Sequence, residues 1–436
     1  MIIRSYIKAI IPLVILQFSI IISAYWMLGD YEVRRFNQWP ISEWMINYQG
    51  GFVRRGMIGN ILHHLALSGG VIPFLYPLVF SFYCTYILIF IVNYIYSRIQ
   101  STTVLVLALL IPGGIFHMAL GPYFYTRKEI LFIIHFGILC LLYRSIQKVN
   151  HENKTLAIGI FGAMTVMGGG FLTLVHEPYL FMAYPITLLL CVIIYVENKQ
   201  NLSSKVVLLI YGLLIPIIFV ICSLNHGDQT ISQQIWDSYQ LKDRIILAPR
   251  APYTAAFSTG GLGWGFAQHL STIYGVFITG TWVYWGFFWL MNGLVMLCIA
   301  YKISSRSISL KGLKFDEQEM SLERSTYVVS IIFAYLISSS MFLIASDYGR
   351  WIACATNLAL LFAFATYKSR YIKIIAIKMH ADVFSFVKKV EEILITKTVL
   401  FLIVLYELVL QMPECCIHGP EIFIRYDKFL MLFNYQ

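Results

Sequence analysis

Charged residues are scarce in this chain. Asp, Glu, Lys and Arg make up 12% of its 436 residues, against roughly 25% in ordinary soluble domains. Hydrophobic residues make up 59%, and the mean hydropathy is +0.73. This composition excludes a water-soluble globular domain, a disordered chain and a coiled coil.

Motifs that hold metals or nucleotides are also missing. Most of the eight cysteines are scattered through apolar runs, where Cys behaves as a small hydrophobic residue, and they have no metal-ligand spacing. His176 has no second His or Cys at ligand distance in the sequence. The sequence contains no P-loop and no Rossmann fingerprint. We therefore predict no metal site, no bound nucleotide and no cofactor.

Long apolar runs are what the sequence does contain. Runs of about 18 or more residues can cross a ~30 Å hydrocarbon core as helices. These runs are apolar on every face, whereas the strand of a membrane β-barrel alternates in polarity over about ten residues. The predicted fold class is therefore all-α, a polytopic transmembrane helical protein of about 11 spans (10–12). The predicted spans are residues 9–28, 71–95, 102–120, 129–143, 155–173, 179–196, 206–224, 271–300, 325–346, 351–367 and 398–412.

The basic residues assign the two sides of the membrane. With a cytoplasmic N-terminus, 20 of the 32 Lys and Arg residues fall on one face, which the positive-inside rule makes cytoplasmic. The net charge of +10 then follows mostly from topology and needs no nucleic-acid partner. Residues 1–436 are predicted to form a single transmembrane domain, with outer loops at about 29–70 and 225–270 and cytoplasmic loops at 301–324 and 368–397. The last of these loops mixes Lys with apolar residues and predicts an amphipathic helix on the inner leaflet.

Arginine dominates the basic residues of the predicted outer face. Nine of the twelve outer basic residues are Arg, whereas the inner face has 6 Arg and 14 Lys. Topogenic charge makes no such distinction, but a phosphate site does, because the guanidinium fork binds phosphate oxygens bidentately. The alternative is structural pairing with the outer carboxylates. The outer Arg residues are Arg34, Arg35, Arg54, Arg55, Arg127, Arg244, Arg250, Arg350 and Arg425.

The most concentrated stretch is Asn47–Asn60, in which glycines flank Arg54 and Arg55. Gly50 and Gly51 permit unusual backbone angles and the close approach of a ligand. The two glycines that follow the arginines permit a helix to pack tightly. Two arginines held in this way suit a polyanion. The alternative is a re-entrant loop that uses glycine only for packing.

Charged residues also occur just beyond the first span and in three short connections between spans. Asp30 or Glu32 is placed to remove a proton from a sugar hydroxyl, as a general base tuned by partial burial, or to pair with a neighbouring arginine. Charges at the membrane boundary are costly unless they pair or bind a ligand, so several on one face predict a site.

We therefore expect Arg54, Arg55, Arg127 and Arg350 to face one outer cavity. The alternative is three separate ion pairs, namely Arg127–Glu129, His176–Glu177 and Asp347–Arg350. The predicted site residues are Asp30, Glu32, His176 and Glu177 for catalysis, and Arg54, Arg55, Arg127, Lys128, Arg244, Arg250, Asp347 and Arg350 for binding phosphate or glycan.

This pattern resembles bacterial membrane glycosyltransferases of the GT-C architecture, and within them the Wzy-type polymerases of O-antigen, capsule and exopolysaccharide. The resemblance rests on the many spans, the acidic first outer loop with Asp30 and Glu32, the Gly-Gly-Phe-Val-Arg-Arg-Gly stretch at 50–56 and the Arg-rich outer connections. One departure is that Asp30-Tyr31-Glu32 only approximates the aspartate pair of eukaryotic-type GT-C enzymes, which leaves the identity of the base open.

The resemblance implies a GT-C-like fold in the bacterial inner membrane, with a cytoplasmic N-terminus and an active face in the periplasm or outside the cell. The implied substrates are a polyprenyl-linked glycan donor and an acceptor, held in the lipid bilayer. Other membrane proteins of polysaccharide assembly are candidate partners. In such chemistry Arg stabilises the leaving polyprenyl phosphate or diphosphate, and a carboxylate or His deprotonates the acceptor hydroxyl.

Two other functions remain open from the sequence. A glycosyltransferase that adds a single sugar to a lipid-linked glycan would need the same groups but a smaller donor pocket. A lipid-linked glycan flippase would need ionisable residues along a central cavity, and charge within the predicted spans is nearly absent apart from Glu407.

Overall fold

The computed structural model describes residues 38–65, 70–97, 102–120, 126–247, 266–307, 317–343, 347–378 and 412. Within these ranges 84% of residues are helical and no strand occurs, which confirms the all-α prediction for this part of the chain. Six helices there are long and apolar enough to cross a membrane. They are α4 (Val71–Tyr96), α7 (Glu129–Lys148), α8 (His151–Val175), α11 (Leu202–Leu224), α16 (Thr281–Ser307) and α18 (Tyr348–Thr366).

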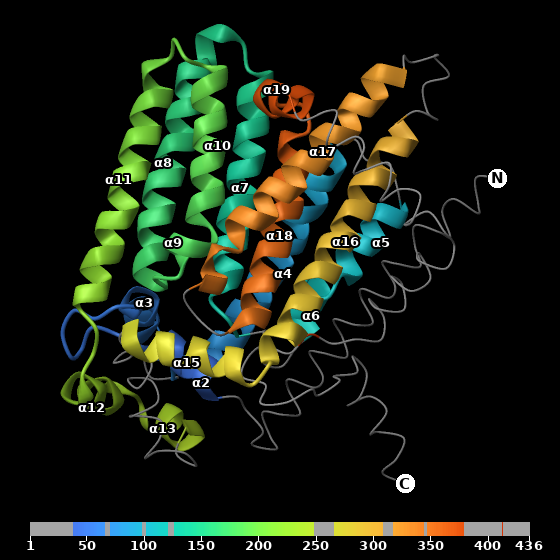
Figure 1. Cartoon of the computed structure of the whole chain (residues 1–436). Coiled ribbons are helices and arrows are strands. Elements are labelled where there is room, and N and C mark those ends of the chain that lie inside the picture. Colours follow the sequence, from blue (N-terminus) through green and yellow to red (C-terminus); the bar gives the residue numbers. More distant parts are fainter. Residues whose placement is uncertain are drawn as a thin grey trace. The chain divides into compact units, whose positions relative to one another are not determined.

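The helices group into two compact units (Figure 1). Unit 1 comprises Met1–Tyr25, Phe90–Gly121 and Ile273–Gln436, and unit 2 comprises Trp26–Ile89 and Pro122–Thr272. Each unit contains helices of membrane-spanning length. The predicted span at 9–28, and all of the predicted span at 398–412 except residue 412, lie outside the described residues.

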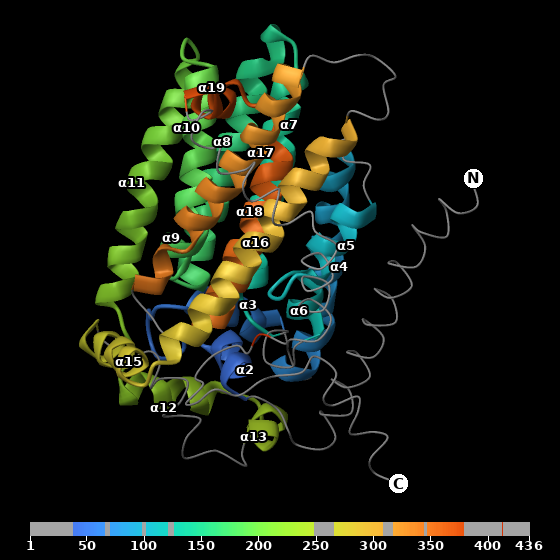
Figure 2. The same ribbon diagram turned by 45° about the vertical axis from the view of Figure 1, so that its right-hand side comes forward.

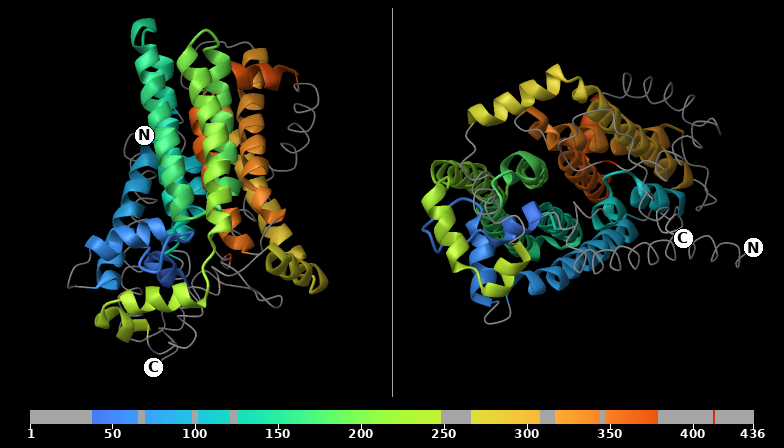
Figure 3. Two further views of the ribbon diagram at one scale, coloured as in Figure 1. Left: turned by 90° about the vertical axis from the view of Figure 1, so that its left-hand side faces the viewer. Right: turned by 90° about the horizontal axis from the view of Figure 1, so that it is seen from below.

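In unit 2, helices α7, α8, α10 (Tyr184–Glu197) and α11 run side by side (Figures 1 and 3). Glycines let α8 and α11 approach closely, since a Cβ on Gly162 would lie 2.2 Å from a methyl group of Val207. On its other side α11 exposes large apolar residues such as Leu209, Leu213 and Ile217. An apolar face of this kind is stable when lipid tails cover it.

Short helices gather at the end of this bundle where α8 ends and α7 begins (Figure 3). They are α2 (Gln38–Met45), α3 (Gly56–Leu65), α9 (Tyr179–Met182), α12 (Gln229–Ser238) and α13 (Leu241–Leu247). Helices α2 and α3 pack so tightly that a Cβ on Gly59 would lie 2.0 Å from the carbonyl oxygen of Ile46. The Asp243 carboxylate of α13 accepts hydrogen bonds from the backbone N–H groups of Val71 (2.8 Å) and Ile72 (3.0 Å), and so caps α4.

In unit 1, α18 is buried along its whole length by its neighbours (Figure 2). The other helices are α5 (Thr102–Leu110), α6 (Ile115–Leu120), α16, α17 (Glu317–Ser338), the 3₁₀ turn η3 (Ser340–Leu343) and α19 (Arg370–Lys378), while α15 (Phe266–Ile278) crosses the boundary of the units. The Nδ2 atoms of Asn292 and Asn357 donate to the carbonyl oxygens of Pro112 (2.6 Å) and Gly113 (2.8 Å). These bonds satisfy backbone groups that the break between α5 and α6 leaves without helical partners.

Three predicted spans are each divided into two helices. The span at 102–120 breaks at residues 111–114, the span at 179–196 breaks at Ala183, and the span at 271–300 breaks before Thr281, where Gly280 has a φ of +71°. Each break lies at a glycine or within two residues of a proline, and both residues interrupt helices. The total of about 11 spans stays a prediction.

Candidate functional site

Eight ionisable side chains from four segments of unit 2 meet at this end of the bundle. The segments are α2, the turn that precedes α3, the start of α7 and the turn between α8 and α9. Seven of the eight residues are buried, and Arg55 is nearly so, with 13% of its side chain exposed. This Arg–Glu cluster consists of Glu43, Arg54, Arg55, Arg127, Lys128, Glu129, His176 and Glu177.

Arg55 is the centre of the cluster. Its backbone φ of +67° lies in the left-handed region, which is costly for a residue with a side chain. Its Nε donates to both carboxylate oxygens of Glu177 at 2.9 Å, its Nη2 donates to Oε1 at 2.7 Å, and its Nη1 lies 3.6 Å from Glu43 Oε1. Burial opposes the charge, but Glu177 and Glu43 outweigh it and raise the pKa of Arg55. The strained backbone thus places a permanent cation between two carboxylates.

Glu177 lies between two arginines. Arg55 holds both of its oxygens, and Arg54 Nη1 lies 3.4 Å from Oε1. Burial favours the protonated form, but the guanidinium groups of Arg55 and Arg54 hold the pKa of Glu177 well below its usual range. Glu177 is therefore ionised, and two forks converge on one carboxylate.

Arg127 and Lys128 add two cations on the other side of Arg55. Arg127 Nη1 lies 3.4 Å from Glu43 Oε2. Lys128 is fully buried, and its Nζ donates to the carbonyl oxygens of Arg55 and Val175 at 3.2 Å each. Burial lowers the pKa of Lys128 to about 7, although Glu43 favours its charged form. Lys128 therefore gains or loses its proton close to neutral pH.

His176 lies between two carboxylates of the cluster. Its Nε2 is 3.5 Å from Glu129 Oε1, and its Nδ1 is 3.8 Å from Glu177 Oε2. Phe132 stacks on the imidazole with ring centroids 6.0 Å apart. Burial lowers the pKa of His176, although Glu129 opposes the shift. The ring is therefore neutral near pH 7 and is able to accept a proton.

The structure brings together half of the predicted site residues. Arg54, Arg55, Arg127, Lys128, His176 and Glu177 are in the Arg–Glu cluster. Asp30, Glu32 and Arg250 lie outside the described residues. Asp347 and Arg350 belong to unit 1, where they form an ion pair with each other, so the expectation that Arg350 shares a cavity with the other arginines stays a prediction.

Arg244 has a structural position in α13. Its Nε donates to the carbonyl oxygen of Tyr239 at 3.0 Å, and its Nη2 donates to that of Asp237. These carbonyl groups lie at the end of α12, where a cation is favourable. Hydrogen bonds to the C-terminal end of α12 therefore account for Arg244 without a ligand.

Two members of the cluster were not among the predicted site residues. Glu129 was expected only as a partner of Arg127, but it also lies next to His176. Glu43 lies inside α2 and is buried, with 5% of its side chain exposed. A carboxylate among apolar residues, as in Ile41-Ser42-Glu43-Trp44, was the signal available in the sequence, because such a group is rarely buried without a cationic partner.

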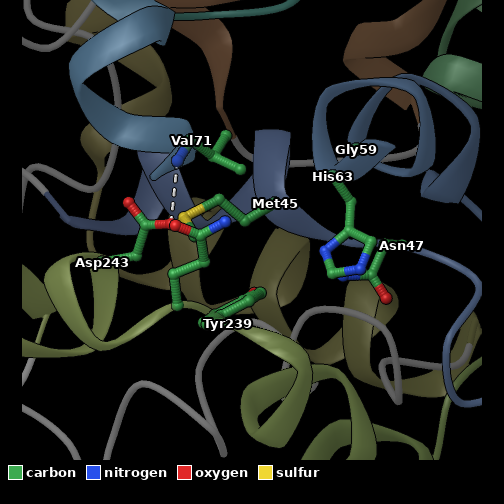
Figure 4. A pocket seen from close by; sticks show the side chains of 8 residues that line it. Met45, Asn47, Gly59, His63, Val71, Tyr239 and Asp243 are labelled. Carbon is green, nitrogen blue, oxygen red and sulfur yellow. Dashed lines mark hydrogen bonds between the residues drawn. The ribbon is translucent and has the colours of Figure 1, made fainter. Parts of the chain in front are cut away.

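A small pocket lies beside the cluster, with α2 and α3 on one side and, on the other, residues 239–243, which connect α12 to α13 and begin α13 (Figure 4). Its cavity measures about 10 Å³, room for about one water molecule, and it is partly open to solvent. Asn47 Nδ2 donates to Ser238 Oγ at 3.0 Å and so joins its two walls. The residues that line it are Met45, Asn47, Gly59, His63, Val71, Tyr239, Gln240 and Asp243. The pocket shows that the predicted outer loops 29–70 and 225–270 pack against each other.

Comparison of the chain with protein-family models, with curated proteins and with solved structures gave no match. Among the residues that the structure describes, no group of three or more His, Cys, Asp or Glu side chains is arranged to hold a metal ion. The geometry of the Arg–Glu cluster and the apolar helices that carry it are therefore the basis for a functional proposal.

Proposed function

We propose that this chain is a membrane glycosyltransferase that uses a polyprenyl phosphate- or diphosphate-linked sugar or oligosaccharide at the outer leaflet. Its product is a surface polysaccharide of a bacterium, which it polymerises from repeat units. One observation carries the proposal: Arg54 and Arg55 converge on a single anion at the end of a bundle of membrane-spanning helices.

The leaving group of this reaction is a polyprenyl phosphate or diphosphate. It departs with the electron pair of the glycosidic C–O bond, so the developing negative charge must be stabilised. Two guanidinium forks placed around one anion position do this, and more strongly in a buried site than in water. Lys128 contributes a third cation when it is protonated.

The acceptor hydroxyl must lose a proton as it attacks the anomeric carbon. His176 is neutral near pH 7 and has a carboxylate near each ring nitrogen. A carboxylate that faces an imidazole orients the ring and stabilises its charged form. His176 therefore takes the proton in the proposed reaction, and Glu129 or Glu177 stabilises the imidazolium.

The surroundings of the cluster suit a lipid-linked substrate. The cluster lies at the ends of α7 and α8, and the adjacent α11 exposes an apolar face that lipid tails would cover. A polyprenyl chain in the bilayer would thus bring its phosphate to the depth of the helix ends. A bacterial inner membrane, a cytoplasmic N-terminus and a periplasmic active face complete the proposal.

The test is the length of surface glycan chains in cells that lack the gene. A polymerase predicts that the ladder of chain lengths collapses to one repeat unit on its carrier, and that the wild-type gene restores it. A ladder of normal length that lacks one side sugar would reject polymerisation in favour of single-sugar transfer. Accumulation of complete repeat units on the cytoplasmic side would instead indicate a flippase.

A further inference from the structure

The position between Arg54 and Arg55 is occupied by a side chain of the protein itself. We propose, on the basis of the proposed function, that Glu177 stands in for the substrate phosphate, which displaces it from the two arginines and frees it to act as a proton acceptor beside His176. Substrate binding would then assemble the base as well as the charge-stabilising pocket.

The first argument is the geometry of the Arg55–Glu177 pair. Two nitrogen atoms of the guanidinium reach the carboxylate at 2.7–2.9 Å, and Nε contacts both oxygens. Arginine binds phosphate oxygens through the same fork. Glu177 thus occupies the coordination position that a phosphate on Arg55 would take, and Arg54 contacts the same oxygen from a second direction at 3.4 Å.

The second argument is that Lys128, and not Glu177, joins the main chains of the segments that carry Arg55 and Glu177. Lys128 Nζ binds the carbonyl oxygens of Arg55 and Val175, and Val175 ends α8 two residues before Glu177. These two hydrogen bonds do not involve the Glu177 side chain. An exchange of anions therefore requires rotation of one side chain and leaves the main chain of the two segments in place.

The third argument is the balance of charge. The cluster holds three arginines and Lys128 against the carboxylates of Glu43, Glu129 and Glu177. With Lys128 neutral these charges cancel. A phosphate added to the intact cluster would place an excess anion in a buried site, which is costly. Replacing one carboxylate by a phosphate avoids most of this cost, provided that the Glu177 carboxylate turns away from the two arginines.

The release of Glu177 also changes its chemistry. While bound, its pKa is held well below the usual range by Arg55 and Arg54, so it is a poor proton acceptor. Moving away from the guanidinium groups returns its pKa toward the ordinary range. Its Oε2 already lies 3.8 Å from His176 Nδ1. The hydroxyl proton of the acceptor would pass to this His–Glu pair.

The experiment compares the purified wild-type protein with Glu177→Gln in lipid nanodiscs. Binding of inorganic pyrophosphate and of polyprenyl phosphate is measured by calorimetry, and glycan transfer is measured separately. The exchange predicts that Glu177→Gln binds both anions about tenfold more tightly, equivalent to about 1.4 kcal/mol, while transfer falls about 100-fold. Tighter binding of polyprenyl phosphate than of pyrophosphate identifies the lipid carrier as the source of the phosphate, and equal binding identifies the phosphate alone.

The result that would overturn the exchange is unchanged or weaker anion binding by Glu177→Gln, as expected if Glu177 only maintains the fold. Glu197→Gln is the matched control, because Glu197 ends α10, outside the Arg–Glu cluster, and accepts hydrogen bonds from Tyr143 and Gln147. Anion binding and glycan transfer should both be unchanged in this control. If Glu177→Gln fails to fold, Glu177→Asp takes its place, since it keeps the charge but shortens the reach and should bind the anions about threefold more tightly.

The two proposals fail in different ways. Polymer formation by the wild type without tighter binding in Glu177→Gln rejects the exchange and leaves the glycosyltransferase in place. Tighter binding in Glu177→Gln, with no transfer by the wild type from any lipid-linked glycan, rejects the glycosyltransferase and retains the exchange as the mode of anion binding.

Discussion

Two groups of charges lie at helix ends in this protein, and they are built differently. In unit 1, Asp347 and Arg350 are three positions apart and form an ion pair at the first turn of α18. In unit 2, Arg55 and Glu177 are separated by 122 positions and lie in segments that only the tertiary fold brings together. A local pair needs no explanation beyond the helix end, where a carboxylate is favourable. A cluster assembled from four segments needs a further explanation.

Exposure of the carboxylates to solvent separates the two groups as well. The side chain of Asp347 is 26% exposed, whereas those of Glu43 and Glu177 are 5% and 8% exposed. Water screens the first pair and lowers its contribution to stability. In the cluster, removing one partner leaves an uncompensated buried charge. Substitutions should therefore affect the two groups unequally, and the four predictions that follow test this difference from the largest effect to the smallest.

Glu43→Gln should give the largest loss of stability, about 3–5 kcal/mol in the free energy of unfolding. Glu43 lies 3.6 Å from an Arg55 nitrogen and 3.4 Å from an Arg127 nitrogen, so its neutralisation leaves both cations with less compensation. Denaturant unfolding in detergent measures the effect, with Glu197→Gln as the control. A loss below about 1 kcal/mol would place Glu43 in the same class as Asp347.

Arg55→Lys should lower glycan production about 10- to 100-fold at equal expression. Lysine retains the charge but lacks the fork that holds both oxygens of Glu177. Arg350→Lys should have a smaller effect, because Asp347, the carboxylate with which Arg350 pairs, is partly exposed to solvent. Arg144→Lys, near the opposite end of α7, serves as the control. Equal losses from Arg55→Lys and Arg350→Lys would remove the distinction between the two groups.

Lys128→Met should alter how stability depends on pH. The pKa of Lys128 is about 7 in the folded protein, below its ordinary value of 10.5, so the unfolded chain binds more protons between these values. The free-energy cost of burying charged Lys128 is greatest below pH 7 and decreases as the pH rises. Thermal unfolding of the wild type should therefore show increasing stability from about pH 7 to 10 relative to Lys128→Met. Parallel curves for the two proteins would contradict the shift.

Asp347→Asn should have the smallest effect, about 1 kcal/mol or less. The substitution removes a partly exposed charge from the first turn of α18 and leaves a neutral side chain of the same shape. Its free energy of unfolding is measured in the same detergent as that of Glu43→Gln. A loss as large as the one expected for Glu43→Gln would show that the pair in unit 1 is part of a larger network.

The sequence predicted the parts of the cluster but not their partners. Arg127 and His176 were identifiable because each lies where a predicted span begins or ends, and Arg54 because glycines flank the arginine pair. Which carboxylate faces which arginine depends on how α2 and α3 pack against each other and α3 against α8. Glu43 was missed because its partners lie 12 to 84 positions away in the chain.

The helical class was predictable for a similar reason, and the helix breaks were not. Hydropathy averaged over a span identifies membrane helices by their total apolar content. A break such as that at residues 111–114 depends on whether side chains elsewhere satisfy the freed carbonyl groups. Asn292 and Asn357 do so from positions 180 and 244 residues further along the chain, which no local pattern reveals.

The capping of α4 by Asp243 has a consequence for how the protein is made. Ribosomes deliver the chain in order, and Val71 emerges 172 residues before the carboxylate that accepts its N–H group. Helix α4 must therefore enter the bilayer with its first turn uncapped, and it gains its cap after α11 has been synthesised. The side of the pocket that α13 forms against α3 and α4 is thus completed late in synthesis. A nascent chain arrested before residue 243 would carry the arginines of the cluster but not this part of their surroundings.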